Sequence, residues 1–427
     1  MNFILKGNIC YSKTAQELET FENAYLVCED GISKGVFSTL PDAYSAFPVT
    51  DYGDNIIIPG LCDMHIHAPQ YTYRGLGMHL ELLDWLNTYT FPEESRFADL
   101  SYAETAYSVF VSDLKKSATT RASIFATLHT PATVRLMEML EESGLATFVG
   151  KVNMDRNSPP ILCEENAQKA YEDTKAWIEQ TKGRFKNTMP IITPRFVPSC
   201  TDDLMLKLKE LQKEHQLPVQ SHLSENQKEI EWVVKELYPG AESYGEVYKR
   251  FGLFGGEGTP TVMAHCVWTK GAEEELLKTQ GVYVAHCPQS NTNLSSGIAP
   301  IRSFLNKGIR TGLGSDVAGG CHTSIFRAMS DAIQVSKLYW RLIDQQDAPL
   351  TEKEAFYLGT LGGGSFFGKV GSFEEGYEFD AVVIDDSSFA MHNAHEKLSL
   401  EDRLARVIYF SGDSFIRGKY VRGNKIE

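Results

Sequence analysis

Eight short apolar runs, separated by longer polar segments, set the strongest limit on how this chain folds. Four of them lead directly into polar residues: 56–61 into Asp63 and His65, 191–194 into Arg195, 218–221 into His222 and 261–264 into His265. The other four lie at 122–128, 146–152, 282–286 and 310–316. A short, continuously apolar run is typical of a strand that is buried on both faces. We therefore expect buried strands with polar side chains at their carboxyl ends.

Segments with helical periodicity and good helix formers lie between these runs, at 101–116, 130–144, 164–181, 201–215 and 271–279. Alternating strands and helices are typical of a parallel sheet. Eight such units over roughly 300 residues fit a (β/α)8 barrel, in which reactive residues gather at the carboxyl ends of the strands. The sequence therefore predicts an α/β protein in which residues 59–365 form a TIM-like catalytic barrel.

The two flanks, residues 1–58 and 366–427, fall outside this pattern. They contain short strand-like pieces at 2–5, 24–27 and 380–384, and the C-terminal flank is rich in glycine turns. Pieces of this kind can pair with one another although they come from opposite ends of the chain. We therefore expect one small β-sandwich domain that is built from both termini.

The charge balance limits the partners of the chain. Its 41 Lys and Arg residues face 56 Asp and Glu residues, which gives a formal net charge of −15. A negative field repels phosphate backbones and anionic lipids. Nucleic acid and membrane surfaces are therefore not expected partners, and a small molecule is the expected ligand.

The cysteines and the apolar segments indicate the compartment. The eight cysteines are scattered without a C-x-x-C pair, which is typical of reduced thiols rather than a disulfide framework. The sequence has no signal-peptide layout at its N-terminus and no apolar run of about 18 residues. We therefore expect a cytoplasmic protein.

The clearest functional signal is the pair His65 and His67. Residues i and i+2 of an extended chain face the same side, so both imidazoles point in one direction. Two ordinary loop histidines would give the same isolated pattern. Three more candidates at equivalent strand ends, His222, His265 and Asp316, favour a metal site. These ligand types suit zinc or iron(II), with one position left open for water.

Two further observations refine this prediction. Glu225 follows His222 by three residues, where its carboxylate can move protons between water and substrate. The fourth strand ends in Arg195 and Phe196 rather than in a lysine that could bridge two ions, so a single ion is favoured. Lys151 on the third strand is the nearest other lysine that could take this bridging role. His79, His286, His322 and Arg74 are left without an assigned role.

Six segments together resemble a known family. They are PGLCDMHIHAPQY at 59–71, RFVPS at 195–199, SHLSEN at 221–226, AHCVW at 264–268, HCPQSNTN at 286–293 and GSDVAGG at 314–320. Their order resembles the mononuclear deaminase branch of the amidohydrolase superfamily. Within that branch, the run HAPQY at 67–71 is most similar to the guanine deaminases.

This resemblance implies a role for each matching residue. It makes one divalent ion, zinc or iron, the cofactor and guanine the purine substrate, which water converts to xanthine and ammonia. It also implies a homodimer. Glu225, His265 and Asp316 would be catalytic, and Gln70, Arg195 and Phe196 would hold the purine. The implied metal ligands are His65, His67, His222 and Asp316.

Three alternatives stay open at this point. The chain can be another amidohydrolase that acts on a different amino-heterocycle, as a deaminase or a chlorohydrolase. It can also be a non-catalytic binding or scaffold protein on the same barrel. Arg195 can simply pair with an acidic neighbour instead of binding substrate.

Overall fold

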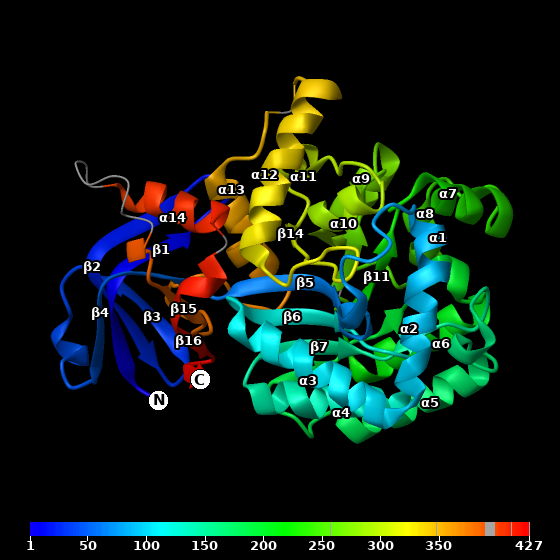
Figure 1. The fold of residues 1–427 in the computed structure, drawn as a ribbon, viewed down its shortest axis with the longest axis horizontal. Coiled ribbons are helices and arrows are strands. Elements are labelled where there is room, and N and C mark those ends of the chain that lie inside the picture. The colour runs from blue at the N-terminus through cyan, green and yellow to red at the C-terminus, as the bar shows by residue number, and fades with distance from the viewer. Residues whose placement is uncertain (257, 347, 389–397, 411, 427) are drawn as a thin grey trace.

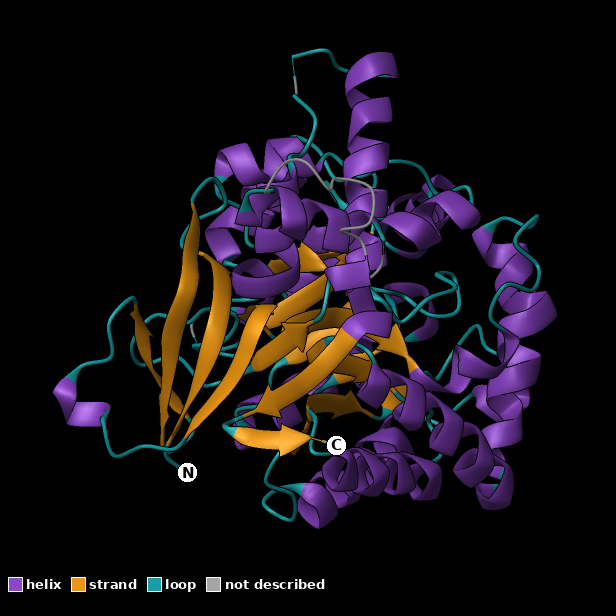
Figure 2. Ribbon diagram, turned by 60° about the vertical axis from the view of Figure 1, so that its left-hand side comes forward, coloured by secondary structure: helices purple, strands orange, loops and turns teal. Residues whose placement is uncertain are grey.

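The computed structural model describes residues 1–256, 258–346, 348–388, 398–410 and 412–426. Within these ranges the chain forms a mixed sheet from its two ends, and a second body of parallel strands surrounded by helices (Figure 1). Figure 2 shows the strands gathered at the centre and the helices on the outside of this second body. The predicted alternation of strand and helix is therefore present along the middle of the chain.

The parallel strands form two sheets of four, each ordered as in the sequence. Their members are β5 (Leu61–His67), β6 (Thr119–Phe125), β7 (Ala146–Gly150), β9 (Thr188–Pro190), β11 (Val219–Leu223), β12 (Thr261–His265), β13 (Tyr283–His286) and β14 (Thr311–Leu313). A short parallel pair joins β8 (Val152–Asn153) and β10 (Thr193–Pro194).

Backbone hydrogen bonds join the two sheets at both edges. The Gln220 amide donates to the Ile192 carbonyl at 2.9 Å, next to β11. On the opposite side, the Asp316 amide donates to the His65 carbonyl at 2.9 Å, which ties the end of β14 to β5. All eight carboxyl ends therefore face one side of the body, as the alternating pattern predicts.

The predicted helices correspond closely to those in the structure. They are α3 (Leu100–Lys116), α4 (Thr130–Ser143), α5 (Ala167–Thr181), α6 (Asp202–His215) and α9 (Ala272–Gln280). The side chain of Asn166 caps α5 by accepting from the Lys169 amide, so this helix begins three residues later than predicted. Glu164, which was placed inside that helix, is free to reach the strand layer.

The remaining helices are mostly short and lie in connections. They are α1 (Leu82–Trp85), α2 (Phe91–Ser95), α7 (Gln227–Glu231), α8 (Tyr244–Arg250), α10 (Pro288–Asn293), α11 (Ile301–Lys307), α12 (Ile325–Leu342), α13 (Glu352–Tyr357) and α14 (Leu400–Tyr409). Among the helices that the structure describes, none is long and apolar enough to cross a membrane.

Strands from both ends of the chain form one sheet of seven, in the order β17-β16-β15-β4-β1-β2-β3. Only the pair β1–β4 is parallel. The bounds are β1 (Phe3–Ser12), β2 (Leu18–Glu29), β3 (Ile32–Phe37), β4 (Val49–Pro59), β15 (Ala381–Ile384), β16 (Ile416–Val421) and β17 (Asn424–Ile426). Both termini therefore contribute to one sheet, and its description as a β-sandwich stays a prediction.

The run at 56–58 corrects one expectation. The pattern at 56–61 predicts one buried strand, whereas the predicted domain boundary places residues 1–58 in the terminal domain. In the structure, 56–59 belong to β4 of the terminal sheet and the parallel strand β5 begins at Leu61. Ile57 packs into a core within the terminal sheet, while Ile56 and Ile58 face the main core. A strand that is buried on both faces has the same apolar pattern in either sheet, so the sequence alone could not separate them.

A buried ion pair connects the terminal sheet to the parallel strands. Arg121 on β6 donates to both carboxylate oxygens of Asp380, at 2.5 and 2.9 Å, and to Glu378 at 2.9 Å. Arg121 and Asp380 are each about 1% exposed. Two residues 259 positions apart are thus held together in a place that water does not reach.

We expect Arg121→Met to lower the free energy of unfolding by about 3–5 kcal/mol, because it leaves the Asp380 carboxylate buried without its cation. Urea unfolding measures this change. Arg135→Met is the control, because Arg135 pairs with Glu104 at the surface and such a pair contributes only about 0–1 kcal/mol. Equal losses in the two variants would contradict the proposed importance of the buried pair.

Candidate active site

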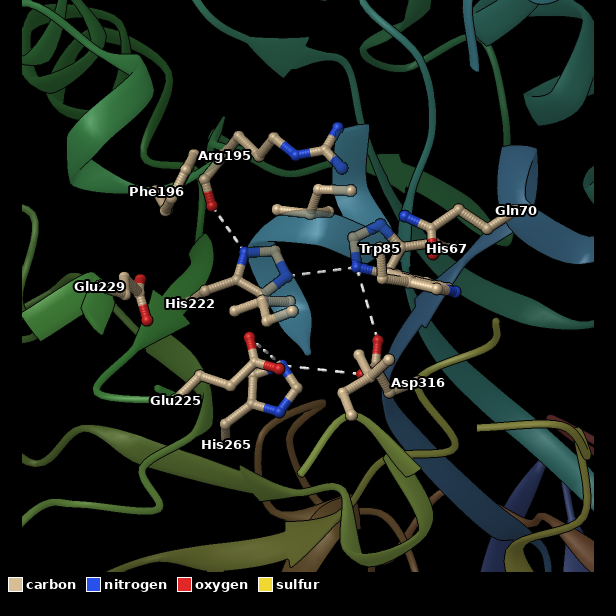
Figure 3. Close-up of a pocket in the computed structure, with 13 residues that line it drawn as sticks. His67, Gln70, Trp85, Arg195, Phe196, His222, Glu225, Glu229, His265 and Asp316 are labelled. Carbon is tan, nitrogen blue, oxygen red and sulfur yellow. Dashed lines mark hydrogen bonds and ion pairs between the residues drawn. The ribbon is translucent and has the colours of Figure 1, made fainter. Parts of the chain in front are cut away.

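Most of the residues predicted at strand ends line one cavity. His65 and His67 end β5, His222 lies on β11, and His265 is the last residue of β12. Asp316 lies three residues after the end of β14. Figure 3 shows His67, His222, His265 and Asp316 facing one another across a common centre. The structure therefore brings together groups that lie up to 251 residues apart in the sequence, as the positions of His65 and Asp316 show.

The side-chain atoms at this centre are close enough to share one ion. The Nε2 atom of His67 lies 3.2 Å from the Nε2 atoms of both His65 and His222. The Oδ1 atom of Asp316 lies 3.1 Å from His65 Nε2 and 3.6 Å from His67 Nε2. His265 is more distant, with its Nε2 atom 3.7 Å from Asp316 Oδ2.

The hydrogen bonds of this cluster indicate that a cation fits it. The Nδ1 atom of His222 donates to the Arg195 carbonyl at 2.6 Å, so the neutral ring keeps a lone pair on Nε2. Burial lowers the pKa of His65, His67 and His222 well below the usual value, which keeps all three rings neutral. Converging nitrogen lone pairs repel one another unless a metal ion lies between them. Imidazole and carboxylate ligands suit zinc or iron.

Two residues that the sequence analysis missed hold this cluster in place. Asp63 accepts hydrogen bonds from the Ser315 amide at 3.0 Å and from the Ser315 hydroxyl at 2.5 Å, which couples β5 to the segment after β14. Burial raises the pKa of Asp63 to about 7. Asn291 contacts His265 Nδ1 through its Oδ1 atom at 2.9 Å. The position of Asp63, two residues before His65 on an inward-facing strand, was the available signal for this role.

Glu225 lies at the edge of the cluster, in contact with His265. Its Oε2 atom is 3.4 Å from His265 Nε2, and its Oε1 atom accepts from the Ser296 hydroxyl at 3.4 Å. Burial, together with the nearby charge of Asp316, raises the pKa of Glu225 well above its usual value. A carboxyl group that keeps its proton near neutral pH is suited to donate it to a substrate.

Gln70, Arg195 and Phe196 all line the same cavity. Arg195 also forms a buried ion pair with Glu94, with nitrogen–oxygen distances of 2.5 and 3.1 Å. The acidic neighbour that the sequence analysis left open therefore exists, although Arg195 reaches the cavity as well. Glu94 itself was not predicted, because it lies on α2, 101 residues before Arg195.

Other cavity residues were also missed. They come from short helices and loops, which the strand-end pattern does not cover: Leu82, Trp85 and Leu86 after β5, Glu229 on α7, and Leu294 after α10. Apolar side chains thus cover one part of the cavity, and an additional buried carboxyl group lines it. The pKa of Glu229 is raised to about 8 by its burial and by Glu225.

The residues without an assigned role lie outside this cavity. Lys151, the rival ligand for a second ion, is instead paired with Glu164 at 2.5 Å. The guanidinium of Arg74 stacks 3.3 Å from the Tyr71 ring. His286 ends β13 and is buried, and neither of its ring nitrogens has a hydrogen-bond partner among the described residues. His79 and His322 are not among the lining residues.

Comparison with known proteins defines the class. The chain matches the amidohydrolase family over residues 56–424. This match covers the parallel strands, all the residues of the proposed metal cluster and most of the C-terminal flank. The chain belongs to the amidohydrolase family.

Within that family, several of the similar proteins are guanine deaminases. The guanine deaminase of Dictyostelium discoideum is 38% identical and spans 99% of this chain and 98% of its own length. The enzyme of Escherichia coli K12 is 34% identical over 88% of this chain and 84% of its own length. The crystal structure of guanine deaminase from C. acetobutylicum with guanine in its active site has a TM-score of 0.95 and 48% identity, with 100% of both chains covered. The resemblance inferred from the sequence motifs is confirmed.

Proposed function

We propose that this chain hydrolyses guanine to xanthine and ammonia. One observation carries the proposal: a single cavity is lined by neutral histidines of the cluster, by a buried acid, Glu225, and by the Arg195 and Phe196 side chains. The guanine deaminase relatives described above, including one with guanine bound, support the same activity. The protein is a hydrolytic deaminase that acts on carbon–nitrogen bonds.

The residues that would hold the metal are His65, His67, His222 and Asp316. Their converging nitrogens and carboxylate oxygen support this assignment. A divalent ion bound there would lower the pKa of a water molecule, so that hydroxide becomes available near neutral pH. Zinc is the proposed ion, and iron is compatible with the same ligands.

Proton transfer is assigned to two carboxyl groups and one imidazole. Asp316 accepts a proton from the attacking water, while Glu225 delivers one to ring nitrogen N3 and prepares carbon C2 for attack. The hydroxyl proton on the resulting tetrahedral carbon then returns to Glu225, and Asp316 passes its proton to the leaving amine, which departs as ammonia. His265, 3.4 Å from Glu225, is proposed to stabilise the oxygen as negative charge develops on it.

The purine is held on the other side of the cavity. The guanidinium of Arg195 donates to the O6 carbonyl oxygen of guanine, and the Phe196 ring packs against the flat base. Gln70 donates to the same edge of the base. The lining of the cavity by all three side chains supports these assignments.

We propose a two-part architecture for this activity. Residues 59–365 form the catalytic (β/α)8 barrel, and residues 1–58 and 366–427 form a small β-sandwich domain. The seven-stranded sheet with strands from both ends supports the second part. The enzyme is proposed to act as a cytoplasmic homodimer in purine catabolism, and its net charge of −15 argues against nucleic acid and membrane partners.

We expect elemental analysis of the purified enzyme to find one divalent ion per chain, together with ammonia release from guanine. Removal of the ion by a chelator should abolish activity and lower Tm, because the ion ties β5, β11 and the segment after β14 together. Calorimetry before and after metal restoration measures the second effect. Two tightly bound ions per chain, or full activity without metal, would contradict this site.

A further inference from the structure

Glu94 is a buried carboxylate that connects two residues of the proposed purine site without lining the cavity itself. It lies on α2, is 3% exposed, and is not among the residues that form the cavity wall. Its Oε1 atom accepts from Gln70 Nε2 at 2.9 Å and from Arg195 Nη2 at 3.1 Å. Its Oε2 atom accepts from Arg195 Nη1 at 2.5 Å. One carboxylate thus organises two donor side chains.

The contacts of Gln70 fix which end of its amide lies beside Arg195. The Ala318 amide donates to Gln70 Oε1 at 3.2 Å, and the Glu94 carboxylate can only accept. Exchanging the amide nitrogen and oxygen would place donor against donor and acceptor against acceptor. The nitrogen end is therefore held toward Glu94, and Figure 3 shows the Gln70 amide and the Arg195 guanidinium on the same side of the cavity.

The shared oxygen makes these two nitrogens neighbours. Gln70 Nε2 and Arg195 Nη2 both lie within 3.1 Å of Glu94 Oε1, and each has a second N–H that this contact does not use. The two remaining N–H groups form a pair of donors on one wall. Such a pair can donate to a ligand edge with two adjacent acceptors. It cannot pair fully with an edge that carries an amino group, because that group is itself a donor.

We propose that Glu94 is a positioning residue that presents Gln70 and Arg195 as a donor pair to the O6 and N7 acceptors of a 6-oxopurine. Guanine carries both acceptors on one edge, whereas adenine carries an amino donor in place of O6. This inference rests on the proposed function, because it assumes that a purine occupies the cavity. It assigns the choice between 6-oxo and 6-amino purines to a residue that does not touch the base.

Equilibrium binding to the metal-loaded enzyme tests the proposal directly. Hypoxanthine has O6 and N7 but no 2-amino group, and unsubstituted purine has N7 but no O6, so calorimetry with these two probes does not depend on turnover. We expect Glu94→Gln to weaken hypoxanthine binding by about ten- to a hundred-fold, because the carboxylate that aligns both donors is lost. Purine binding should change by less than about two-fold, since purine cannot use the pair.

Two further variants make the test specific. Glu94→Asp retains the charge and should recover part of the hypoxanthine affinity. If Glu94→Gln fails to fold, the affinities of Glu94→Asp for hypoxanthine and for purine replace those of Glu94→Gln in the test. Glu354→Gln is the matched control, because Glu354 is also buried and also accepts two bonds from one arginine, Arg302, at 2.5 and 2.7 Å, but does not line the cavity. It should change stability without changing the ratio of the two affinities.

The failure of this proposal is distinguishable from failure of the proposed function. Wild-type enzyme that neither deaminates guanine nor binds hypoxanthine would contradict the proposed function. If the wild-type enzyme does both and Glu94→Gln binds hypoxanthine with unchanged affinity, the positioning role of Glu94 is contradicted while the proposed function stands. An equal loss of hypoxanthine and purine binding would also reject it, because it would mean general disruption of the cavity.

Discussion

Glu225→Gln is expected to reduce guanine deamination by about 10²- to 10⁴-fold, which is the usual contribution of a positioned acid–base group. The substitution keeps the size of the side chain and removes its ability to carry the proton. Glu225 is buried beside His265, and burial together with Asp316 raises its pKa, which favours the protonated acid that the proposed step requires. Steady-state kcat and KM with guanine measure the loss.

The metal content of this variant separates proton transfer from damage to the site. Glu225 is not one of the proposed ligands, so Glu225→Gln should retain one ion per chain. Glu210→Gln, on an exposed position of α6, is the control for the general effect of a Glu-to-Gln change. Near-normal turnover by Glu225→Gln would mean that the proton is carried by another group, of which Glu229 is the nearest candidate along the chain.

The convergence of the residues proposed as the metal cluster was predictable, because their positions depend on little more than strand order. Parallel strands bring their carboxyl ends to one face, whatever the exact bounds of each strand. His65, His222, His265 and Asp316 each stand at or next to such an end. An error of several residues, such as the assignment of Ile56–Ile58 to the wrong sheet, therefore left the predicted cluster intact.

The supporting residues were not predictable, because each depends on the path of a connection rather than on a repeating pattern. Glu94 reaches Arg195 only because the segment after β5 returns across the cavity through α1 and α2. Asn291 reaches His265 from the first turns of α10, in the next strand–helix unit. Neither contact leaves a periodic signal in the sequence, and both residue types are common on surfaces.

We expect the selectivity for guanine over adenine to depend on how Arg195 is held, which is the second prediction with a large effect. The wild-type enzyme should prefer guanine to adenine by about 10³-fold or more in kcat/KM, because a site built to pair with an acceptor leaves its donors unmatched when the ligand presents an amino group. Each unmatched buried donor costs about 1–3 kcal/mol, and more when it is charged. The guanidinium is 4% exposed and already paired with Glu94, so it cannot turn away to solvent.

Arg195→Ala is therefore expected to lower kcat/KM for guanine by about 10²- to 10³-fold and to erase most of the preference over adenine. The same change leaves the Glu94 carboxylate buried without its cation, so thermal unfolding must be measured in parallel. Arg195→Lys is the companion variant: it keeps the charge for Glu94, but a single ammonium cannot reach both carboxylate oxygens and the base as a planar guanidinium does. We expect Arg195→Lys to fold and to bind the metal, but to discriminate poorly between guanine and adenine. Equal efficiency of the wild type on both bases, or an unchanged guanine rate in Arg195→Ala, would mean that the ion pair with Glu94 is purely structural and that selectivity lies elsewhere in the cavity.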